Sequence, residues 1–381
     1  MAYFDNAATT FPKPEIVYSF MEKFYREVGG SFGRGNYFQA NSAKKIVDET
    51  RNLLTEIISA GDKQVIFTPS ATIALNMIIQ GVIHGGAKNI YISPFEHNAV
   101  TRTLNYFEKL GKISVTELFV TQDFNFDFEK IEKQFKNLRP DFVIVSHASN
   151  VTGLILPVEK IFELAKNFGA TTLVDMAQTA GLVEINVGLE TVDFAVFAGH
   201  KTLFAPTGVG GFFMKNSAKL EPVIFGGTGF DSANQNMPET LPEKFEVGTL
   251  NILGIAGLNA ALKWIKNQTV KKIFETEKNY RQKLINLLGE YDFIKIVGNV
   301  EKKNYVGIVS CVIDGISSDS AGNIFAERGI SVRSGLQCAP LAHKFLKTFP
   351  AGTVRFSTNF FNTEKDFAEL REVLEEIKFA I

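Results

Sequence analysis

Residues 171–181, TTLVDMAQTAG, and residues 193–210, DFAVFAGHKTLFAPTGVG, contain the pattern that decides the fold. Each segment begins with a short run of β-branched and apolar residues, as expected for a strand that is covered on both faces. The first run ends at an acid, Asp175, and the second is followed within three residues by a lysine, Lys201. Because α/β sheets bind ligands at the carboxyl ends of their strands, we expect both side chains to lie at that edge.

A carboxylate and a lysine at such buried positions destabilise the fold unless a ligand uses both charges. Pyridoxal 5′-phosphate is a ligand of this kind, because a lysine forms a Schiff base with its aldehyde and an acid pairs with its pyridinium nitrogen. The pattern therefore predicts a pyridoxal-phosphate site at Asp175 and Lys201. The alternative is a structural ion pair at the strand ends.

Outward from this stretch, short apolar runs alternate with amphipathic segments. The runs predict strands at residues 65–67, 90–93, 115–120, Phe142–Ser146, 172–175, Phe194–Ala198 and 209–214. Helices are predicted between them at residues 71–83, 99–110, 128–138 and 158–168, after two earlier helices at Glu15–Glu27 and 40–60. This alternation predicts an α/β fold with a mainly parallel sheet and helices on both faces.

The pattern changes near residue 254, and 381 residues are enough for two or three domains. One long helix is predicted from there to residue 291, then a strand at 307–314 and helices near 319–328 and 364–379. These elements predict a second, smaller α+β domain. Residues 226–248 are rich in Gly, Asn and Pro and predict a long loop, which in a compact enzyme is usually functional.

The composition argues against several classes of protein. The net charge is −1 and no basic stripe carries interleaved aromatics, so we expect no nucleic-acid partner. No apolar run reaches the roughly 18 residues of a membrane span, and the first residues lack the layout of a signal peptide. Two cysteines, Cys311 and Cys338, are too few for a disulfide framework or a four-thiolate metal site. We expect a cytoplasmic enzyme without a metal ion.

Polar side chains follow other predicted strands. The imidazole of His97 could stack on a planar cofactor and transfer protons, although a lone histidine is usually structural. The amide of Asn150 or Gln178 could donate to the phenolate oxygen of the ring, although a loop Asn more often serves a turn. Residues 68–72, TPSAT, begin a helix, whose N–H groups could bind a phosphate or simply receive an N-cap.

The C-terminal part offers a thiol and a cation. Cys338 lies in a polar loop with Gly335 and Arg333, so an exposed and reactive thiol is expected there, whereas Cys311 lies in an apolar run and should be inert. Arg355 lies in a strand-like segment, and its guanidinium could hold the carboxylate of an amino acid. The alternative for Arg355 is a surface salt bridge.

Eight motifs occur in an order that resembles the class V aminotransferase family, in its cysteine desulfurase and selenocysteine lyase branch. They are DNAATT (5–10), EHNAV (96–100), SHASNVTG (146–153), VDMAQ (174–178), GHK (199–201), FEVGT (245–249), RSGLQCAP (333–340) and GTVRFS (352–357). The resemblance covers nearly the whole chain. It implies the fold-type I architecture of pyridoxal-phosphate enzymes, with a large cofactor-binding α/β domain of residues 15–255. A small α+β domain of residues 1–14 and 256–381 would carry the cysteine loop, and the enzyme would be a homodimer with active sites at the interface.

The resemblance also implies roles for single residues. Lys201 resembles the Schiff-base lysine, Asp175 the pyridinium partner and His97 the ring-stacking histidine. The remaining cofactor-binding positions are Gln178 and Asn150 near the phenolate oxygen, Ala71, Thr72 and His200 in the phosphate cup, and Thr249 supplied to that cup by the neighbouring subunit. Arg355 resembles the arginine that binds the substrate carboxylate, with Arg333 nearby. Cys338 resembles the sulfur-accepting cysteine, in a short loop similar to that of the group II enzymes.

The implied reaction converts L-cysteine to L-alanine and leaves the sulfur on Cys338 as a persulfide, for transfer to a possible acceptor protein. L-Selenocysteine is the alternative substrate. Another class V reaction (transamination, epimerisation or β-elimination) with Cys338 as a bystander, and a scaffold without turnover, also remain open.

Two departures from the family pattern bear on these roles. Ala198 replaces a Ser or Thr that often binds the phosphate, which removes a hydrogen bond worth about 1–3 kcal/mol. Leu336 and Gln337 stand where many group II enzymes have histidines, which leaves the choice between cysteine and selenocysteine open.

Overall fold

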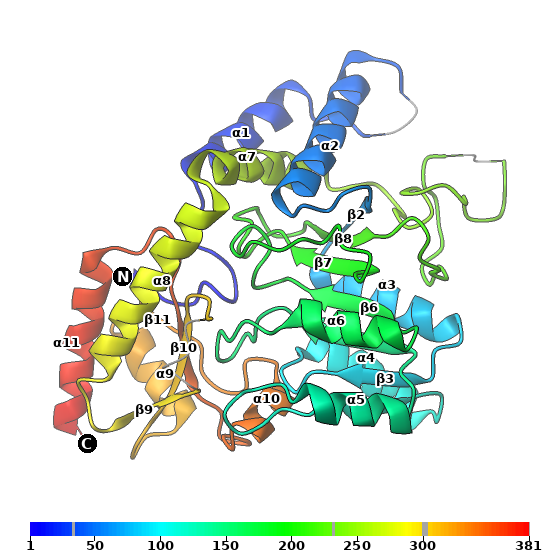
Figure 1. The fold of residues 1–381 in the computed structure, drawn as a ribbon. Coiled ribbons are helices and arrows are strands. Elements are labelled where there is room, and N and C mark those ends of the chain that lie inside the picture. The colour runs from blue at the N-terminus through cyan, green and yellow to red at the C-terminus, as the bar shows by residue number, and fades with distance from the viewer. Residues whose placement is uncertain (33–34, 231–232, 299–303, 381) are drawn as a thin grey trace.

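A seven-stranded, mainly parallel sheet forms the centre of the computed structural model, which describes residues 1–32, 35–230, 233–298 and 304–380 (Figure 1). Its strands are β2 (Gln64–Thr68), β3 (Asn89–Ile92), β4 (Ser114–Glu117), β5 (Phe142–Ser146), β6 (Thr171–Asp175), β7 (Phe194–Ala198) and β8 (Gly210–Met214). Their order is β2-β8-β7-β6-β5-β3-β4, and β8 runs antiparallel to both of its neighbours while the pairs from β7 to β4 are parallel. The predicted sheet is therefore confirmed.

Helices cover both faces of this sheet because its strands are apolar on both sides. Along β5, Phe142 and Ile144 face a core shared with α3 (Ala71–His84) and α4 (Asn98–Lys109). The alternate residues Val143 and Val145 face a core shared with α5 (Phe128–Asn137) and α6 (Val158–Asn167). Because successive side chains of a strand point to opposite faces, one apolar run contributes to two separate cores.

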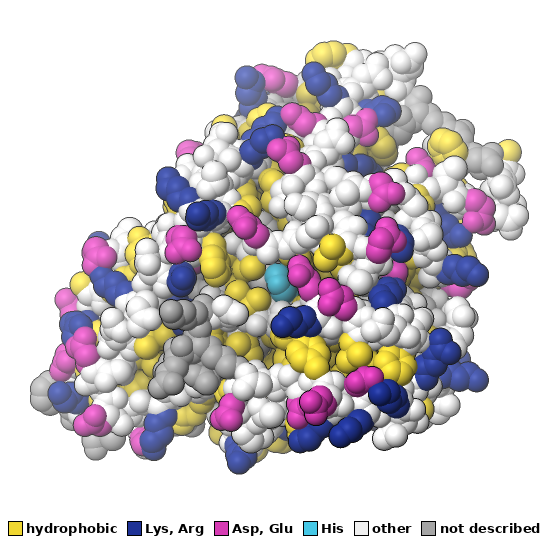
Figure 2. Space-filling view, in the orientation of Figure 1, with side chains coloured by type: hydrophobic (Ala, Val, Ile, Leu, Met, Phe, Trp, Pro, Cys, Tyr) yellow, Lys and Arg dark blue, Asp and Glu magenta, His cyan; other side chains and the backbone are white. Residues whose placement is uncertain are grey.

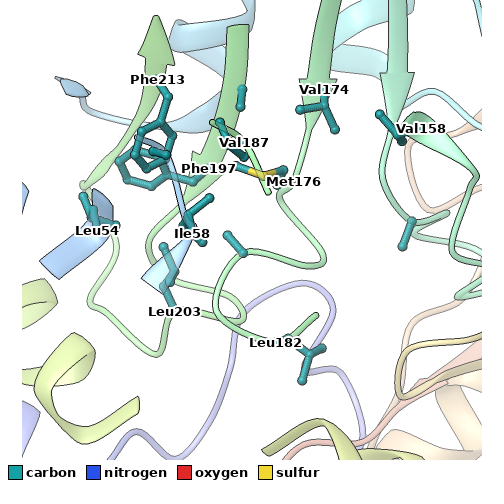
Figure 3. Close-up of a cluster of buried hydrophobic side chains, with 14 of the residues drawn as sticks. Leu54, Ile58, Val158, Val174, Met176, Leu182, Val187, Phe197, Leu203 and Phe213 are labelled. Carbon is teal, nitrogen blue, oxygen red and sulfur yellow. The ribbon is translucent and has the colours of Figure 1, made fainter. Parts of the chain in front are cut away.

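The second core continues under a bundle of α1 (Glu15–Glu27), α2 (Phe38–Ile57) and α7 (Ile252–Gln268). Figure 3 shows Phe197 and Phe213 from neighbouring strands beside Leu54 and Ile58, and the two phenyl centroids are 5.7 Å apart. These contacts attach the helix bundle to the antiparallel edge of the sheet. The expected domain boundary at residue 255 falls inside α7.

Both ends of the chain meet in a second body. It contains a three-stranded antiparallel sheet of β9 (Ile294–Val297), β10 (Ile308–Ile313) and β12 (Val354–Ser357), in the order β12-β10-β9. The short strand β1 (Ala2–Tyr3) pairs in parallel with β11 (Ile330–Ser331). The helices of this body are α8 (Val270–Leu288), α9 (Ser318–Glu327), α10 (Pro340–Phe345) and α11 (Glu364–Ala380). Figure 1 shows both termini on this side of the molecule. Asp5 lies near the cysteine loop, since its Oδ2 is 3.8 Å from Nη1 of Arg333.

The single helix predicted from 254 to 291 is wrong, because α7 and α8 are separate helices. The break lies at Thr269, whose φ is +69°, and its hydroxyl oxygen accepts a hydrogen bond from the N–H of Lys272. Thr269 thus acts as the N-cap of α8. No Gly or Pro marks the break, so the apolar periodicity runs through it.

Residues 226–248 form no helix or strand in their described part, as predicted, and residues 231–232 lie outside the description. Among the helices that the structure describes, none is long and apolar enough to cross a membrane.

Candidate active site

A cleft at the carboxyl ends of β5, β6 and β7 collects most of the residues that the sequence singled out. Its lining includes Ala71, Thr72, His97, Asn150, Asp175, Gln178, Ala198, His200 and Lys201. Cys338, Arg333, Arg355 and Thr249 do not line this cleft. Parallel strands end at one edge, so residues up to 130 positions apart converge there.

Asp175 and Lys201 share the cleft without pairing directly. No contact within 4.0 Å joins the carboxylate of Asp175 to the amine of Lys201, so the alternative of a structural ion pair is wrong. Asp175 is 6% exposed, and its Oδ1 accepts a hydrogen bond of 2.9 Å from the N–H of Ala177. Burial raises the pKa of Asp175, which the Ala177 hydrogen bond and the charge of Lys201 oppose. Burial lowers the pKa of the Lys201 amine, and the charges of Asp175 and Cys338 act in the opposite direction. An acid and an amine held apart in a desolvated cleft leave space for a group that binds both.

His97 is the N-cap of α4. Its Nδ1 accepts a hydrogen bond of 3.0 Å from the N–H of Ala99, so the proton of the neutral ring is on Nε2. Burial, followed by the charges of Lys201, Arg355 and Arg102, lowers the pKa of His97 to about 4. The ring in the cleft is therefore neutral near pH 7, and the capping bond determines its orientation.

The start of α3 has the features of an anion site. Ser70 caps this helix, since its Oγ accepts a hydrogen bond of 3.3 Å from the N–H of Ile73, and the plain-cap alternative is correct for this residue. The next two N–H groups, of Ala71 and Thr72, have no acceptor within the helix, as at any helix start. A Cβ at Gly210 would lie 3.0 Å from the nitrogen of Ala71, which is a tight contact, so glycine favours this close approach of β8. Nδ1 of His200 is buried at the same cleft without a partner among the described residues.

The amides of Asn150 and Gln178 are partly engaged by the protein. Nδ2 of Asn150 donates to the carbonyl of Gln337 at 2.7 Å, and Nε2 of Gln178 donates to the carbonyl of Ala7 at 3.0 Å. Each amide nitrogen keeps a second hydrogen, and Oδ1 of Asn150 is buried without a partner in the described chain. Both residues thus connect the cleft to segments distant in the sequence.

Sequence reasoning missed Glu96, which is fully buried beside the cleft. Its carboxylate accepts hydrogen bonds from Oγ of Ser93 at 2.5 Å and from N and Oγ of Ser146 at 2.7 and 2.8 Å. Burial raises its pKa to about 7 against these hydrogen bonds, with a smaller contribution from Asp175. The sequence signal that could have indicated Glu96 is its position directly before His97. Glu96 ties the end of β3 to the end of β5 and so supports the turn that carries His97.

Arg355 is buried, not at the surface. It is 3% exposed on β12, its Nη2 lies 2.9 Å from Oδ1 of Asp5, and its Nη1 donates to the carbonyl of Asn150 at 3.0 Å. The alternative of a surface salt bridge is therefore wrong, and Asp5 is a partner that sequence reasoning missed. Nη1 of the half-exposed Arg333 lies 3.8 Å from the other oxygen of Asp5. Two guanidinium groups share one carboxylate, and the buried Nε of Arg355 has no partner among the described residues, which suits an anionic ligand.

Cys338 is exposed and Cys311 is buried, as predicted. Burial raises the pKa of Cys311 to about 12, which makes this thiol inert. Cys338 borders a cavity of about 530 Å³ that also contacts Thr72 and His97, two residues of the cleft. Its thiol therefore lies next to the cleft and faces solvent.

Thr249 and the three remaining histidines do not line the cleft. Thr249 is exposed, and His84 is exposed at the end of α3. His147 is buried beside the hydroxyl of Thr179, with an Nδ1 to Oγ1 distance of 2.9 Å. His343 is fully buried, and its Nε2 lies 2.9 Å from Oε1 of Gln337 in the Cys338 loop.

Charges of both signs are interspersed over the face shown in Figure 2, with no broad basic area on that face. In the described part of the chain, no group of three or more His, Cys, Asp or Glu side chains is arranged to hold a metal ion.

Comparison with known proteins places these features in a family. Residues 2–370 match the model of the family Aminotransferase class-V. A probable cysteine desulfurase of Methanothermobacter thermautotrophicus is 31% identical, over 98% of this chain and 94% of its own length. A probable cysteine desulfurase of Pyrococcus abyssi is also 31% identical, over 98% of this chain and 94% of its own length.

Solved structures agree in fold. The apo structure of the cysteine desulfurase from Thermococcus onnurineus superposes with a TM-score of 0.90 at 28% identity, covering 100% of this chain and 95% of that one. A NifS-like protein superposes with a TM-score of 0.85 at 24% identity over the whole of both chains. At that identity the second likeness concerns the fold alone.

Proposed function

The chain belongs to the aminotransferase class-V family, and from this premise we propose that it is a cysteine desulfurase that uses pyridoxal 5′-phosphate. It would convert L-cysteine to L-alanine and transfer the sulfur to Cys338. The observation that carries the proposal is an exposed thiol beside a cleft that is lined by the buried acid Asp175 and the partly buried Lys201. Relatives described as probable cysteine desulfurases over nearly the whole chain support it.

The residues of the cleft fit the cofactor. Asp175 would hold its ring nitrogen, Lys201 its aldehyde and His97 the face of its ring, while Asn150 and Gln178 lie on the same cleft for its phenolate oxygen. The first turn of α3 and the unpartnered Nδ1 of His200 suit its phosphate. When bound, the cofactor would accept electron density from the Cα of the substrate.

The protein's own groups would supply binding, proton transfer and the nucleophile. Arg355 would bind the substrate carboxylate through its free Nε, with Arg333 adding positive charge at the entrance. Lys201 can act as the base at Cα because burial lowers the pKa of its amine. The thiolate of Cys338 would attack the substrate sulfur: an S–S bond forms, the C–S bond breaks with its electron pair left on carbon, and that carbon takes up a proton to give alanine.

We extend the proposal to the assembly. Thr249 is exposed and does not line the phosphate cup of its own chain, which supports its donation to the cup of a second copy in a homodimer. Large apolar side chains are exposed on α1, on α2 and in the loop before α7, and a second copy would cover them if they belong to the dimer contact: Ile16, Tyr25, Phe38 and Phe225. We also propose the division into a large domain of residues 15–255 and a small domain of 1–14 and 256–381. The two free thiols suit the reducing cytoplasm, where a sulfur-acceptor protein would meet Cys338.

The test is product release from L-cysteine and from L-selenocysteine in the presence of a thiol reductant. We expect the wild type and Cys311→Ala to release alanine and sulfide, and Cys338→Ala to lose at least about a hundredfold in rate because its nucleophile is missing. A yellow colour that borohydride bleaches would report the cofactor on Lys201.

Two other outcomes would contradict the assignment. Unchanged sulfide release by Cys338→Ala would make the thiol a bystander and favour another class V reaction. Selenocysteine turnover that survives this substitution, with negligible cysteine turnover, would identify a selenocysteine lyase.

A further inference from the structure

The backbone that presents the Cys338 thiol is strained. Gln337 and Cys338 have φ angles of +40° and +59°, so two consecutive residues with side chains adopt the left-handed conformation. This conformation costs about 1–2 kcal/mol for each such residue. It persists only where surrounding contacts impose it, so the contacts of this turn must be identified.

The side chain of Gln337 points inward and is 6% exposed, although the next residue is exposed. Its Nε2 donates to the carbonyl of Thr353 at 2.8 Å and to that of Arg333 at 3.4 Å. Its Oε1 accepts from Oγ1 of Thr353 at 3.2 Å and lies 2.9 Å from Nε2 of His343. The amide is therefore bound at both of its polar atoms.

His343 is fully buried on α10 and holds the Gln337 amide from below. Because Oε1 of Gln337 can only accept, Nε2 of His343 carries the proton, and its Nδ1 accepts from Oγ1 of Thr348 at 2.8 Å. Burial lowers the pKa of His343 to about 4, so the ring stays neutral and keeps this tautomer near pH 7.

Two backbone hydrogen bonds connect the same turn to the active-site cleft. The carbonyl of Gln337 accepts from Nδ2 of Asn150 at 2.7 Å, and the carbonyl of Cys338 accepts from the N–H of Asn98 at 2.7 Å. Asn150 lines the cleft, and Asn98 directly follows His97. The strained turn is thus held by His343 on one side and by Asn150 and Asn98, at the cofactor cleft, on the other.

We propose that Gln337 and His343 form a positioning pair, which holds Cys338 in the left-handed conformation from which its sulfur reaches the substrate. The inference rests on the proposed function and assigns a role to the residue at which this chain departs from the histidine of many group II enzymes. Neither residue lines the cleft that contains Asp175 and Lys201. The pair acts on the sulfur-transfer step alone, because Cα proton removal belongs to Lys201.

The test separates these two steps in the holoenzyme. His343→Leu removes the donor to Gln337, and Gln337→Met removes the amide at similar length. We expect each to lower kcat for sulfide release from L-cysteine by about tenfold to a hundredfold, as for a reacting group displaced by about 1 Å. KM, the cofactor absorbance and the exchange of the Cα proton of L-alanine in D₂O should change less than about twofold. His84→Leu, at an exposed position, is the matched control.

Two conservative variants of His343 test whether the hydrogen bond from its Nε2 is the contact that positions Gln337. A glutamine at position 343 can place an amide N–H where Nε2 of the histidine lies, whereas asparagine reaches only the Nδ1 position. We therefore expect His343→Gln to recover most of the lost kcat and His343→Asn to recover little.

Each result is decisive. Wild-type kcat in either His343→Leu or Gln337→Met would overturn the positioning role. Parallel losses of sulfide release, alanine exchange and cofactor absorbance would also overturn it, since they indicate general structural damage. A wild-type enzyme that exchanges the Cα proton but releases no sulfide would refute the proposed function itself, and the inference with it.

Discussion

Glu277 is a buried carboxyl group at which the effect of burial on pKa and on stability can be tested directly. It lies on α8, is 5% exposed, and has no hydrogen-bond or ion-pair partner in the described chain. Arg281, one turn further along the helix, donates instead from Nε to the carbonyl of Ile308 at 3.3 Å and stacks on Tyr305 at 4.2 Å from the ring centroid. Burial alone raises the pKa of Glu277 from 4.5 to about 8.

The sign of the pH effect follows from linkage. The folded-state pKa of Glu277 is raised, so the folded protein holds a proton that the unfolded chain loses above its own pKa. The stability is therefore fully present below pH 4.5 and decreases as pH rises toward about 8. With these two values, the carboxyl lowers the free energy of unfolding by about 2.5 kcal/mol between pH 5.5 and pH 7.5.

Glu277→Gln removes the titration while keeping the size and polarity of the side chain. We expect the variant to gain about 2.5 kcal/mol relative to wild type when urea unfolding of the holoenzyme is moved from pH 5.5 to pH 7.5. Other titrating groups are common to both proteins and cancel in the difference. The fluorescence of Trp264, the single tryptophan, reports the transition from α7, where it packs 4.9 Å from Phe204.

Two results would refute this reasoning. The first is a difference between the two proteins that does not change with pH, which would mean that Glu277 does not titrate in this range. The second is a wild type that grows more stable than Glu277→Gln toward pH 7.5, which would mean an ionised Glu277 paired with Arg281.

Two further substitutions test the cofactor and substrate positions. Ala198→Ser, at a cleft position that is 2% exposed, supplies the hydroxyl that is missing from the phosphate cup. We expect the apoenzyme of this variant to bind pyridoxal 5′-phosphate about tenfold more tightly in a titration. An unchanged affinity would mean that the hydroxyl does not reach the phosphate. Arg355→Lys keeps the charge but loses the planar fork that binds Asp5 and Asn150, so KM for L-cysteine should rise about tenfold to a hundredfold in steady-state assays. An unchanged KM would exclude Arg355 as the carboxylate site.

The central sheet and its cleft could be predicted from local patterns. Apolar runs of three to six residues predict covered strands, and the residues that end or directly follow a run in the parallel part of the sheet lie at its carboxyl edge. The pattern therefore predicts Asp175, Lys201 and His97 at this edge, and all three line the cleft. The exposed Cys338 and the buried Cys311 followed from the polarity of their neighbours in the same way.

Such local patterns cannot predict contacts between residues that are far apart in the sequence. The ion pair of Arg355 joins residues 350 positions apart, and its burial follows from the meeting of the two chain ends. The break at Thr269 depends on a positive φ that no Gly or Pro marks in the sequence.

The sequence by itself determined which residue types are available and which of them follow buried strands, because secondary structure depends on neighbours a few positions away. Only the tertiary structure decided how Cys338 is presented. In the sequence Gln337 is only a departure from the histidine of many group II enzymes, and its contacts with Asn150, Thr353 and His343 appear only in the structure. Hydrogen bonds between segments depend on how the chain packs in three dimensions, and a pattern of period two or 3.6 contains no information about them.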